Sequence, residues 1–266
     1  MSKTYALITG ASQGLGRAFA LELAKRKFST ILVSLPGEDL RSIASQVEAL
    51  GQEAHFYETD LTNKENIVAL AAWVNQHFPL SVLINNAGCG GTQSFKSASL
   101  DYLDRIIQLN VKATSLLTHQ LLPNLTQRDQ AYVLNVGSVA AYSPIGYKTV
   151  YPASKAFVYS FTRGLYQEFA DSNVFFSVVN PGPMMTNAVS SASLQQQGFL
   201  ASMGLLTPEQ VAAISIRRLL KRDPLIMLNW VNKLTWLVMK FLPVYIRLPL
   251  LTNAFKKEIK QEIKRA

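Results

Sequence analysis

The sequence predicts an α/β domain in which a doubly wound parallel sheet of about seven strands carries helices on both faces. Short apolar runs alternate with longer segments of helical period along residues 5–228. The strand candidates are apolar throughout, which is typical of parallel strands buried on both faces. Glycine and polar residues gather directly after these runs, where ligands bind in such sheets. These observations together favour one ligand-binding α/β domain.

The composition agrees with a single large globular domain. The chain has 266 residues, of which 48% are hydrophobic and 16% charged, so it is long enough for a sizeable core and too apolar for disorder. Its single cysteine, Cys89, excludes a disulfide within the chain and fits a reducing compartment, so we expect a cytoplasmic protein. The three histidines are scattered without metal-ligand spacing, and we expect no metal site.

The positive charge is concentrated near the C-terminus. The chain has a formal net charge of +9, and residues 221–266 carry 10 Lys and Arg against 3 Asp and Glu. A nucleic-acid surface needs basic residues across a face of the domain, with aromatic residues for stacking. Because the excess belongs to the tail, we expect no nucleic-acid partner.

Seven apolar runs predict the strands. The first lies near the N-terminus, is too short for a signal peptide and is followed at once by a glycine loop, so a strand is expected there. The others recur between helical segments and are bounded by turn residues. The expected strands are Tyr5–Ile8, Thr30–Ser34, Ala54–Tyr57, Ser81–Ile84, Tyr132–Val136, Val174–Val179 and Leu225–Leu228.

Six helices are predicted between these strands. Apolar residues recur at helical spacing within Glu38–Leu50, and Gly51 follows as a stop signal. Thr62 with Glu65 has capping-box spacing, and Thr207-Pro208-Glu209-Gln210 is a second helix start. Pro152 belongs in a first turn. The remaining expected helices are Leu15–Lys27, Leu100–Leu122 and Tyr151–Ala170, and those that start at Thr62 and Thr207 extend to about Gln76 and Leu220.

The first strand leads into the loop from Thr9 to Gly16, whose glycines are spaced Gly-x-x-x-Gly-x-Gly. A strand, a glycine loop and a helix in this order form a phosphate site, because glycine lets backbone amides approach a pyrophosphate at the helix N-terminus. Tight strand-to-helix turns also use glycine, but the position of this loop directly after the first strand favours a dinucleotide site.

Tyr151 and Lys155 are four residues apart and share one face of the predicted helix. A phenol has a pKa of about 10, and a nearby cation lowers it, which lets the tyrosine exchange a proton with a substrate oxygen. Ser138 directly follows a strand and could hold the same oxygen. A tyrosine and a lysine at this spacing also occur as an ordinary helix pair.

Taken together, these motifs resemble the short-chain dehydrogenase/reductase family over residues 4 to about 228. The resemblance implies a Rossmann-type sheet and an NAD(P)-dependent oxidoreductase. It rests on the glycine loop, Asp60-Leu61, Asn85-Asn86-Ala87-Gly88, Asn110, Ser138, Tyr151-x-x-x-Lys155 and Pro181-Gly182 with Thr186.

The family implies a role for each matching position. The catalytic residues would be Tyr151 as general acid/base, Lys155 lowering its pKa and holding the nicotinamide ribose, Ser138 orienting the substrate oxygen, and Asn110 supporting a water relay to the lysine. The cofactor would be bound by Gly10, Ser12, Gln13, Gly14, Leu15, Gly16, Ser34, Asp60, Leu61, Asn86, Ala87, Gly88, Tyr151, Lys155, Pro181, Gly182 and Thr186.

The position that usually distinguishes NAD from NADP departs from the family pattern. Ser34-Leu35-Pro36 follows the second strand, where an acidic residue is typical of NAD enzymes and a basic one just after it of NADP enzymes. Gln13 stands where NADP enzymes also carry a basic residue. Because no carboxylate is expected there to repel a 2′-phosphate and Ser34 could hydrogen-bond one, the sequence weakly favours NADP(H).

The substrate side is expected to be apolar. Residues 183–206, which would cover the active site in this family, contain no charged residue. Phe95, Tyr142, Ile145 and Tyr147 are expected to line the same pocket. We therefore expect an oxidoreductase acting on the carbonyl or secondary alcohol of a lipophilic substrate. A 3-oxoacyl-thioester reductase and a non-catalytic dinucleotide-binding sensor or scaffold remain open, and family members often form oligomers.

Residues 229–266 are expected to be a basic, amphipathic extension of the catalytic domain, 1–228. Lys233, Lys240 and Arg247 interrupt its apolar runs, so it is too polar for a transmembrane helix, and Pro243 should break it in two. Two alternatives stay open. The tail lies on an anionic membrane surface, or it packs on the domain or on a second subunit and closes the substrate pocket.

Overall fold

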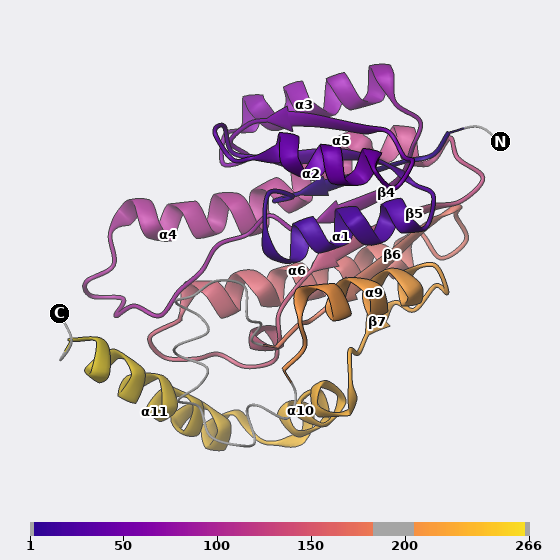
Figure 1. Ribbon diagram of the computed structural model, residues 1–266. Helices are drawn as coiled ribbons and strands as arrows, with labels where there is room; N and C mark the ends of the chain where they lie inside the picture. The colour runs from indigo at the N-terminus through magenta and orange to yellow at the C-terminus, as the bar shows by residue number, and fades with distance from the viewer. Residues whose placement is uncertain (1–2, 183–204, 264–266) are drawn as a thin grey trace.

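The computed structural model describes residues 3–182 and 205–263. Its centre is a sheet of seven parallel strands in the order β3-β2-β1-β4-β5-β6-β7, as the sequence predicts (Figure 1). The strands are β1 (Tyr5–Thr9), β2 (Ser29–Ser34), β3 (Ala54–Glu58), β4 (Leu80–Asn85), β5 (Ala131–Val136), β6 (Val174–Val179) and β7 (Leu225–Ile226). The chain order reverses between β1 and β4, which places a ligand crevice beyond the carboxyl ends of these strands.

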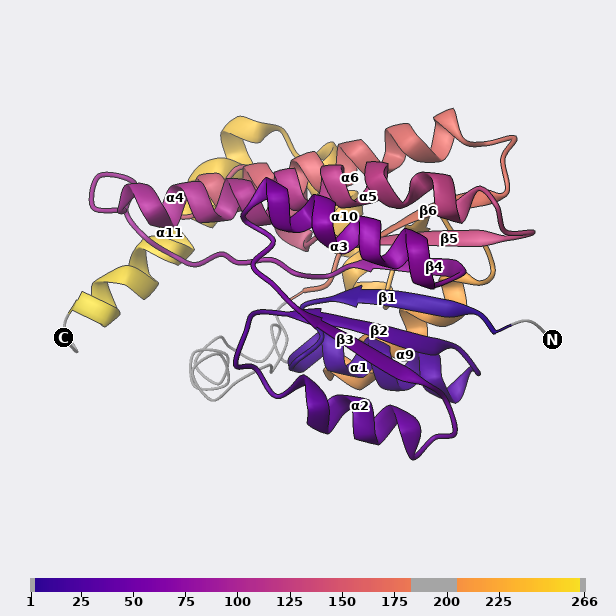
Figure 2. The same ribbon diagram turned by 90° about the horizontal axis from the view of Figure 1, so that it is seen from above.

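Helices cover both faces of the sheet, and each face has its own apolar core. On one face lie α1 (Gly14–Lys25), α2 (Leu40–Glu48) and α9 (Pro208–Leu219), with Phe19 of α1 completely buried (Figure 2). On the other face lie α3 (Lys64–His77), α4 (Leu100–Ile107), α5 (Thr114–Leu125) and α6 (Val150–Glu168), and the core on this face, which includes buried Phe176 of β6, is formed with residues of α3, α5 and α6. Burial on both faces explains why the strands are apolar throughout.

The long helix expected over Leu100–Leu122 is interrupted. Between α4 and α5 lies η1 (Gln108–Ala113), a π-helical turn, and it contains buried Asn110. Such turns insert an extra residue into a helix and occur frequently at functional sites. The interruption therefore re-aims one polar side chain while the helix continues along the sheet.

The two predicted helix starts have different outcomes. Thr207 and Gln210 form the expected capping box at α9. At α3 the expectation is wrong, because Asn63 caps the helix and its Oδ1 accepts a hydrogen bond from the N–H of Glu65 at 2.8 Å. The N–H of Thr62 donates instead to Asp60 Oδ1 at 2.9 Å. The helix cap therefore lies one residue later than the pattern suggests.

The tail forms two helices, α10 (Trp230–Phe241) and α11 (Val244–Ile263), separated by Pro243 as expected. They lie together along the lower edge of the molecule in Figure 1, far from α2 and α3. The expected boundary at residue 228 falls between β7 and α10. No helix among residues 3–182 and 205–263 is long and apolar enough to cross a membrane.

Candidate active site

The turn between β1 and α1 is built for a close approach of backbone. Gly10 has φ +64°, a conformation that favours glycine. A Cβ atom on Gly16 would overlap the carbonyl oxygen of Gly10, so the start of α1 packs against the turn only because residue 16 has no side chain. The amide of Asn86 clamps the turn by donating to the oxygens of Thr9 (2.9 Å) and Gly10 (3.2 Å).

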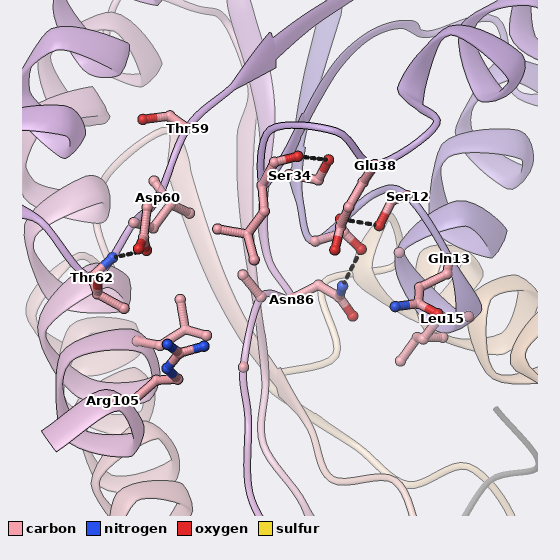
Figure 3. Close-up of a pocket in the computed structure, with 18 residues that line it drawn as sticks. Ser12, Gln13, Leu15, Ser34, Glu38, Thr59, Asp60, Thr62, Asn86 and Arg105 are labelled. Carbon is pink, nitrogen blue, oxygen red and sulfur yellow. Dashed lines mark hydrogen bonds between the residues drawn. The ribbon is translucent and has the colours of Figure 1, made fainter. Parts of the chain in front are cut away.

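A cavity of about 510 Å³ opens beside this turn (Figure 3). The loops that follow β1, β2, β3 and β4 form its wall, as expected for the carboxyl edge of a doubly wound sheet. The expected residues that line it are Gly10, Ser12, Gln13, Gly14, Leu15, Gly16, Ser34, Asp60, Leu61, Asn86, Ala87 and Gly88. Six further residues complete the wall, namely Leu35, Glu38, Thr59, Thr62, Arg105 and Leu109.

Among these six further residues, Glu38 is the one that contradicts a sequence-based expectation. Its carboxylate accepts a hydrogen bond from the hydroxyl of Ser12, across the end of the cavity that Ser34 and Leu35 also line (Figure 3). The only cation among the described lining residues is Arg105, which lies on the opposite side beside Asp60 and Thr62. The expectation that this end of the pocket holds no carboxylate is therefore wrong. The loop from Leu35 to Asp39 carries Glu38 back toward the glycine turn, which the local pattern does not reveal.

A second cavity of about 420 Å³ adjoins the first, and the two share Leu15, Asn86 and Gly88 as wall residues. Besides these three, five further expected residues from three separate segments line this cavity, namely Ser138, Tyr151, Lys155, Pro181 and Gly182. Thr186, the last expected cofactor residue, lies outside the described residues. The fold thus places the tyrosine, lysine and serine next to the glycine-turn cavity.

Lys155 is buried at the inner end of this second cavity. Its ammonium group donates a hydrogen bond to the carbonyl oxygen of Val136 at 2.9 Å. Burial lowers the pKa of Lys155 from 10.5 to about 8, because the charged form loses its contact with water. The lysine therefore titrates close to neutral pH.

Tyr151 behaves differently from the sequence-based expectation. Burial raises the pKa of its phenol, and a hydrogen bond with Ser138 opposes that rise. Desolvation outweighs the lowering by Ser138, so the pKa of Tyr151 moves upward and not downward as expected from a neighbouring cation. A raised pKa keeps the phenol protonated at neutral pH, with its oxygen beside the serine.

Asn110 does not line either cavity, but it supports their shared wall. Its Oδ1 accepts from the N–H of Cys89 (2.9 Å), and its Nδ2 donates to the carbonyl oxygen of Cys89 (2.8 Å) and to Ser154 Oγ (2.9 Å). The π-turn therefore ties the loop after β4 to α6, which carries Tyr151 and Lys155. The water relay that the resemblance implies for Asn110 stays a prediction.

Asn180 holds Ser138 in place and was not anticipated from the sequence. Its Oδ1 accepts a hydrogen bond from the N–H of Ser138 at 3.0 Å, and its Nδ2 donates to the hydroxyl of Tyr142 at 2.9 Å. A Cβ atom on Gly137 would overlap the same Oδ1. Glycine at position 137, where the family commonly has a second serine, is therefore required by the amide of Asn180.

The apolar wall expected around the substrate is only partly seen among the described residues. None of Phe95, Tyr142, Ile145 and Tyr147 lines the cavity that contains Ser138 and Lys155, but Phe95 and Tyr147 share a smaller pocket with Tyr151. Ile145 is buried and the ring of Tyr142 packs edge-on against Tyr159, so both have structural roles instead. Residues 183–204, on which the same expectation rests, are not described.

Comparison with known proteins identifies the family. Residues 4–197 match the sequence profile of the short chain dehydrogenase family. The chain belongs to this family. It is an NAD(P)-dependent oxidoreductase, in agreement with the glycine turn and the tyrosine–lysine pair.

Two curated relatives and one solved structure illustrate the similarity. The ketoacyl reductase HetN of Nostoc is 31% identical over 84% of this chain and 77% of its own length. The very-long-chain 3-oxoacyl-CoA reductase of Anas platyrhynchos is 32% identical over 66% of this chain and 58% of its own length. A metagenomic short-chain oxidoreductase in complex with NADP is 26% identical, with a TM-score of 0.70 over 84% of this chain and 92% of the other.

Proposed function

We propose that this short chain dehydrogenase interconverts a carbonyl and a secondary alcohol, with Tyr151 as the general acid/base. The observation that carries the proposal is the convergence of Ser138, Tyr151 and Lys155 on one cavity. That cavity adjoins the glycine-turn cavity through Leu15, Asn86 and Gly88, so a bound dinucleotide would reach from one into the other.

The residues around the first cavity fit a dinucleotide. Because residue 16 has no side chain, the start of α1 packs closely on the glycine turn, and a helix N-terminus beside such a turn suits a pyrophosphate. Asp60 and Leu61 would hold the adenine, and Asn86 to Gly88 would flank the adenosine ribose. A nicotinamide cofactor would supply or accept the hydride.

The chain's own residues would handle the proton. The phenol of Tyr151, kept protonated by burial, would donate its proton to the carbonyl oxygen during reduction. The side chain of Ser138 is hydrogen-bonded to Tyr151 and would hold the same substrate oxygen. Lys155 would hold the nicotinamide ribose, and its pKa of about 8 lets it restore a proton at neutral pH. Asn110 would act as a positioning residue through Cys89 and Ser154.

Glu38 supports NAD(H) as the preferred cofactor, in contrast to the sequence-based preference for NADP(H). The carboxylate of Glu38 accepts a hydrogen bond from Ser12 and would repel a 2′-phosphate. The hydroxyl groups of an unmodified ribose could donate hydrogen bonds to the same carboxylate. Among the described lining residues, no cation lies at this end of the cavity to compensate. A higher kcat/KM with NADPH than with NADH for every good substrate would overturn this preference.

We propose a lipophilic substrate. Pro181 and Gly182 line the second cavity, and residues 183–206, which follow them in the sequence, contain no charged residue. A 3-oxoacyl thioester is the second candidate. The printed names of the two curated relatives, a ketoacyl reductase and a 3-oxoacyl-CoA reductase, favour it. Both candidates share the same reacting carbonyl and differ in the group that carries it.

The test begins with binding of NADH and NADPH to wild type and to Tyr151→Phe, followed by turnover on lipophilic ketones and 3-oxoacyl thioesters. We expect both proteins to bind the reduced cofactor and only wild type to turn over. Binding without turnover on any member of the panel would instead favour a dinucleotide-binding sensor. Failure of both cofactors to bind would refute the assignment of the glycine turn.

We also propose a homo-oligomer formed through α4 and α6. An apolar cavity between these helices is lined by Phe95, Ile107, Val111, Thr149, Val150, Ala153 and Ser154. Leu100 and Phe157 add exposed apolar surface nearby. Light scattering should give a mass of at least two chains, and Ile107→Glu should lower it; a wild-type monomer at micromolar concentration would contradict the proposal.

A further inference from the structure

The outer face of α10 carries an exposed apolar stripe. Trp230, Leu234, Leu237, Val238 and Phe241 recur three or four residues apart, and all of them are exposed. Asn232, on the opposite side of the same helix, is buried. A helix with one polar, buried anchor and an apolar outer stripe is the reverse of an ordinary surface helix, whose apolar stripe faces the core.

The inner side of the tail is fastened to the catalytic domain at two points. Asn232 Nδ2 donates to the carbonyl oxygen of Asn180 at 3.2 Å, and the N–H of Gly146 donates to Thr252 Oγ1 at 3.0 Å. Arg247 joins the two helices by donating to the carbonyl oxygen of Met239. The apolar stripe therefore points outward on a helix that is held in place by Asn180, whose side chain also bonds to Ser138, and by the loop at Gly146 that leads into α6.

The exposed apolar surface continues onto the first turns of α11. Phe241 is 72% exposed and Tyr245 73% exposed, and Val244, Ile246, Leu248 and Leu250 are exposed as well. More than half of the large apolar side chains that are exposed among the described residues lie between 230 and 250. Contiguous apolar surface of this kind marks an interaction site.

Positive charge borders the stripe. Lys233 and Lys240 are seven residues apart along one edge of it, and both are exposed. The ammonium of Lys240 lies 5.0 Å from the ring centroid of Trp236. Residues 221–266 as a whole carry 10 Lys and Arg against 3 Asp and Glu. Apolar and aromatic side chains flanked by lysines are typical of helices that lie in the interface of an anionic bilayer.

A second copy of the chain fits this surface less well. In a two-fold symmetric contact, the same patch faces itself, so the lysine borders of the two copies would approach each other. Like charges at such a border cost affinity. An anionic lipid surface meets the apolar stripe and the lysines at once.

We propose that the outer face of α10 and the start of α11 dock on an anionic lipid bilayer. The apolar stripe enters the headgroup region, and Lys233 and Lys240 contact lipid phosphates and carboxylates at its edge. Through the contacts with Asn180 and Gly146, this docking holds the catalytic cavity close to the membrane surface. The inference does not depend on which substrate the enzyme turns over.

The test is flotation of the full-length protein with vesicles of phosphatidylcholine alone or with about one third phosphatidylserine. We expect binding to the anionic vesicles at low salt, weaker binding at high salt, and weak binding to phosphatidylcholine alone. The triple variant Trp230→Ala, Phe241→Ala, Tyr245→Ala and the double variant Lys233→Glu, Lys240→Glu should each lower binding at least about tenfold.

Matched controls separate this face from the rest of the surface. Leu50→Ala with Phe56→Ala and Val68→Ala removes exposed apolar side chains elsewhere, and Lys25→Glu with Lys64→Glu reverses exposed charges elsewhere. Both controls should bind vesicles like wild type, and circular dichroism should show that all variants are folded. A wild type that ignores anionic vesicles at low salt overturns the proposal. The proposal is also overturned if the triple variant binds vesicles like wild type but has a smaller mass in light scattering, because a second copy of the chain would then cover the stripe.

Discussion

Any side chain at Gly137 would occupy the position of the Asn180 amide oxygen. That oxygen accepts a hydrogen bond from the N–H of Ser138, a serine that lines the second cavity. The side-chain amide of Asn180 also donates to the hydroxyl of Tyr142, and its backbone carbonyl oxygen accepts from Asn232 of α10. Asn180 therefore connects the loop that carries Ser138 with the tail, and position 137 must remain small for the connection to form.

Gly137→Ser should lower the free energy of unfolding by about 1–3 kcal/mol, because the added atoms overpack a filled site. Asn180→Gly should also destabilise, since the N–H of Ser138 loses its partner. The double variant should lose less free energy of unfolding than the two single variants lose together, because the added serine no longer clashes once the amide of residue 180 is removed. Urea unfolding of the four proteins measures this coupling.

Gly164→Ser in α6 is the matched control, since a Cβ there meets nothing within 4 Å. It should change the free energy of unfolding by less than about 1 kcal/mol. Simple additivity of Gly137→Ser and Asn180→Gly would contradict the relationship described here.

Tyr151→Phe should lower kcat by about 10²–10⁴-fold while leaving the Kd for reduced cofactor within a few-fold of wild type. The substitution removes one oxygen from the wall of the second cavity and leaves the glycine turn untouched. Steady-state kinetics and fluorescence titration with NADH provide the two readouts. Tyr159→Phe, which keeps the ring that packs against Tyr142, is the control and should retain wild-type kcat. Loss of cofactor binding in Tyr151→Phe would assign the tyrosine a structural role instead.

Burial of Lys155 makes stability depend on pH with a definite sign. The folded-state pKa is about 8 and the reference value is 10.5, so the unfolded chain binds the proton more strongly. Below pH 8 both states are protonated, and folding carries the full cost of the buried charge. This cost, roughly 3 kcal/mol, should disappear as the pH rises from about 8 to 10.5.

Lys155→Met isolates this effect, because other groups titrate equally in both proteins. The stability of wild type relative to Lys155→Met should increase between about pH 7 and pH 9.5, as measured by urea unfolding at each pH. A pH-independent difference between the two proteins would mean that the lysine does not titrate near pH 8.

Glu38→Gln should raise kcat/KM for NADP(H) relative to NAD(H) by about tenfold, because it removes a negative charge next to the place expected for the 2′-phosphate. The amide can still accept the hydrogen bond from Ser12. Glu48→Gln at the end of α2 removes an exposed charge outside the cavity and should leave the ratio unchanged. An unchanged ratio in Glu38→Gln would show that this carboxylate does not select the cofactor.

Much of the fold follows from local patterns. The strands lie within one or two residues of their expected ends, because an apolar run bounded by turn residues is a short-range signal. The capping box at Thr207 is local for the same reason. At Thr62 the same pattern fails, because the carboxylate of Asp60 competes for the backbone N–H.

The candidate site was predicted unevenly. Every expected cofactor residue among those described lines one of the two cavities. Most of them lie at the carboxyl ends of the parallel strands or in the loops that follow, and Tyr151 and Lys155 lie on α6. Glu38 and Asn180 were missed, because each acts on a segment that is distant in the sequence. Of the residues proposed for the apolar wall, only Phe95 and Tyr147 share a pocket with Tyr151, because hydrophobic character does not tell which cavity a side chain faces.

The sequence by itself determined the order of strands and helices, the glycine turn and the tyrosine–lysine pair, since each depends on residues only a few positions apart. Only the tertiary structure decided that Glu38 reaches Ser12, that Asn180 requires glycine at position 137, and that the stripe on α10 faces outward. It also decided the direction of the Tyr151 pKa. Burial and through-space contacts depend on how distant segments pack, and that packing is established only when the whole chain has folded.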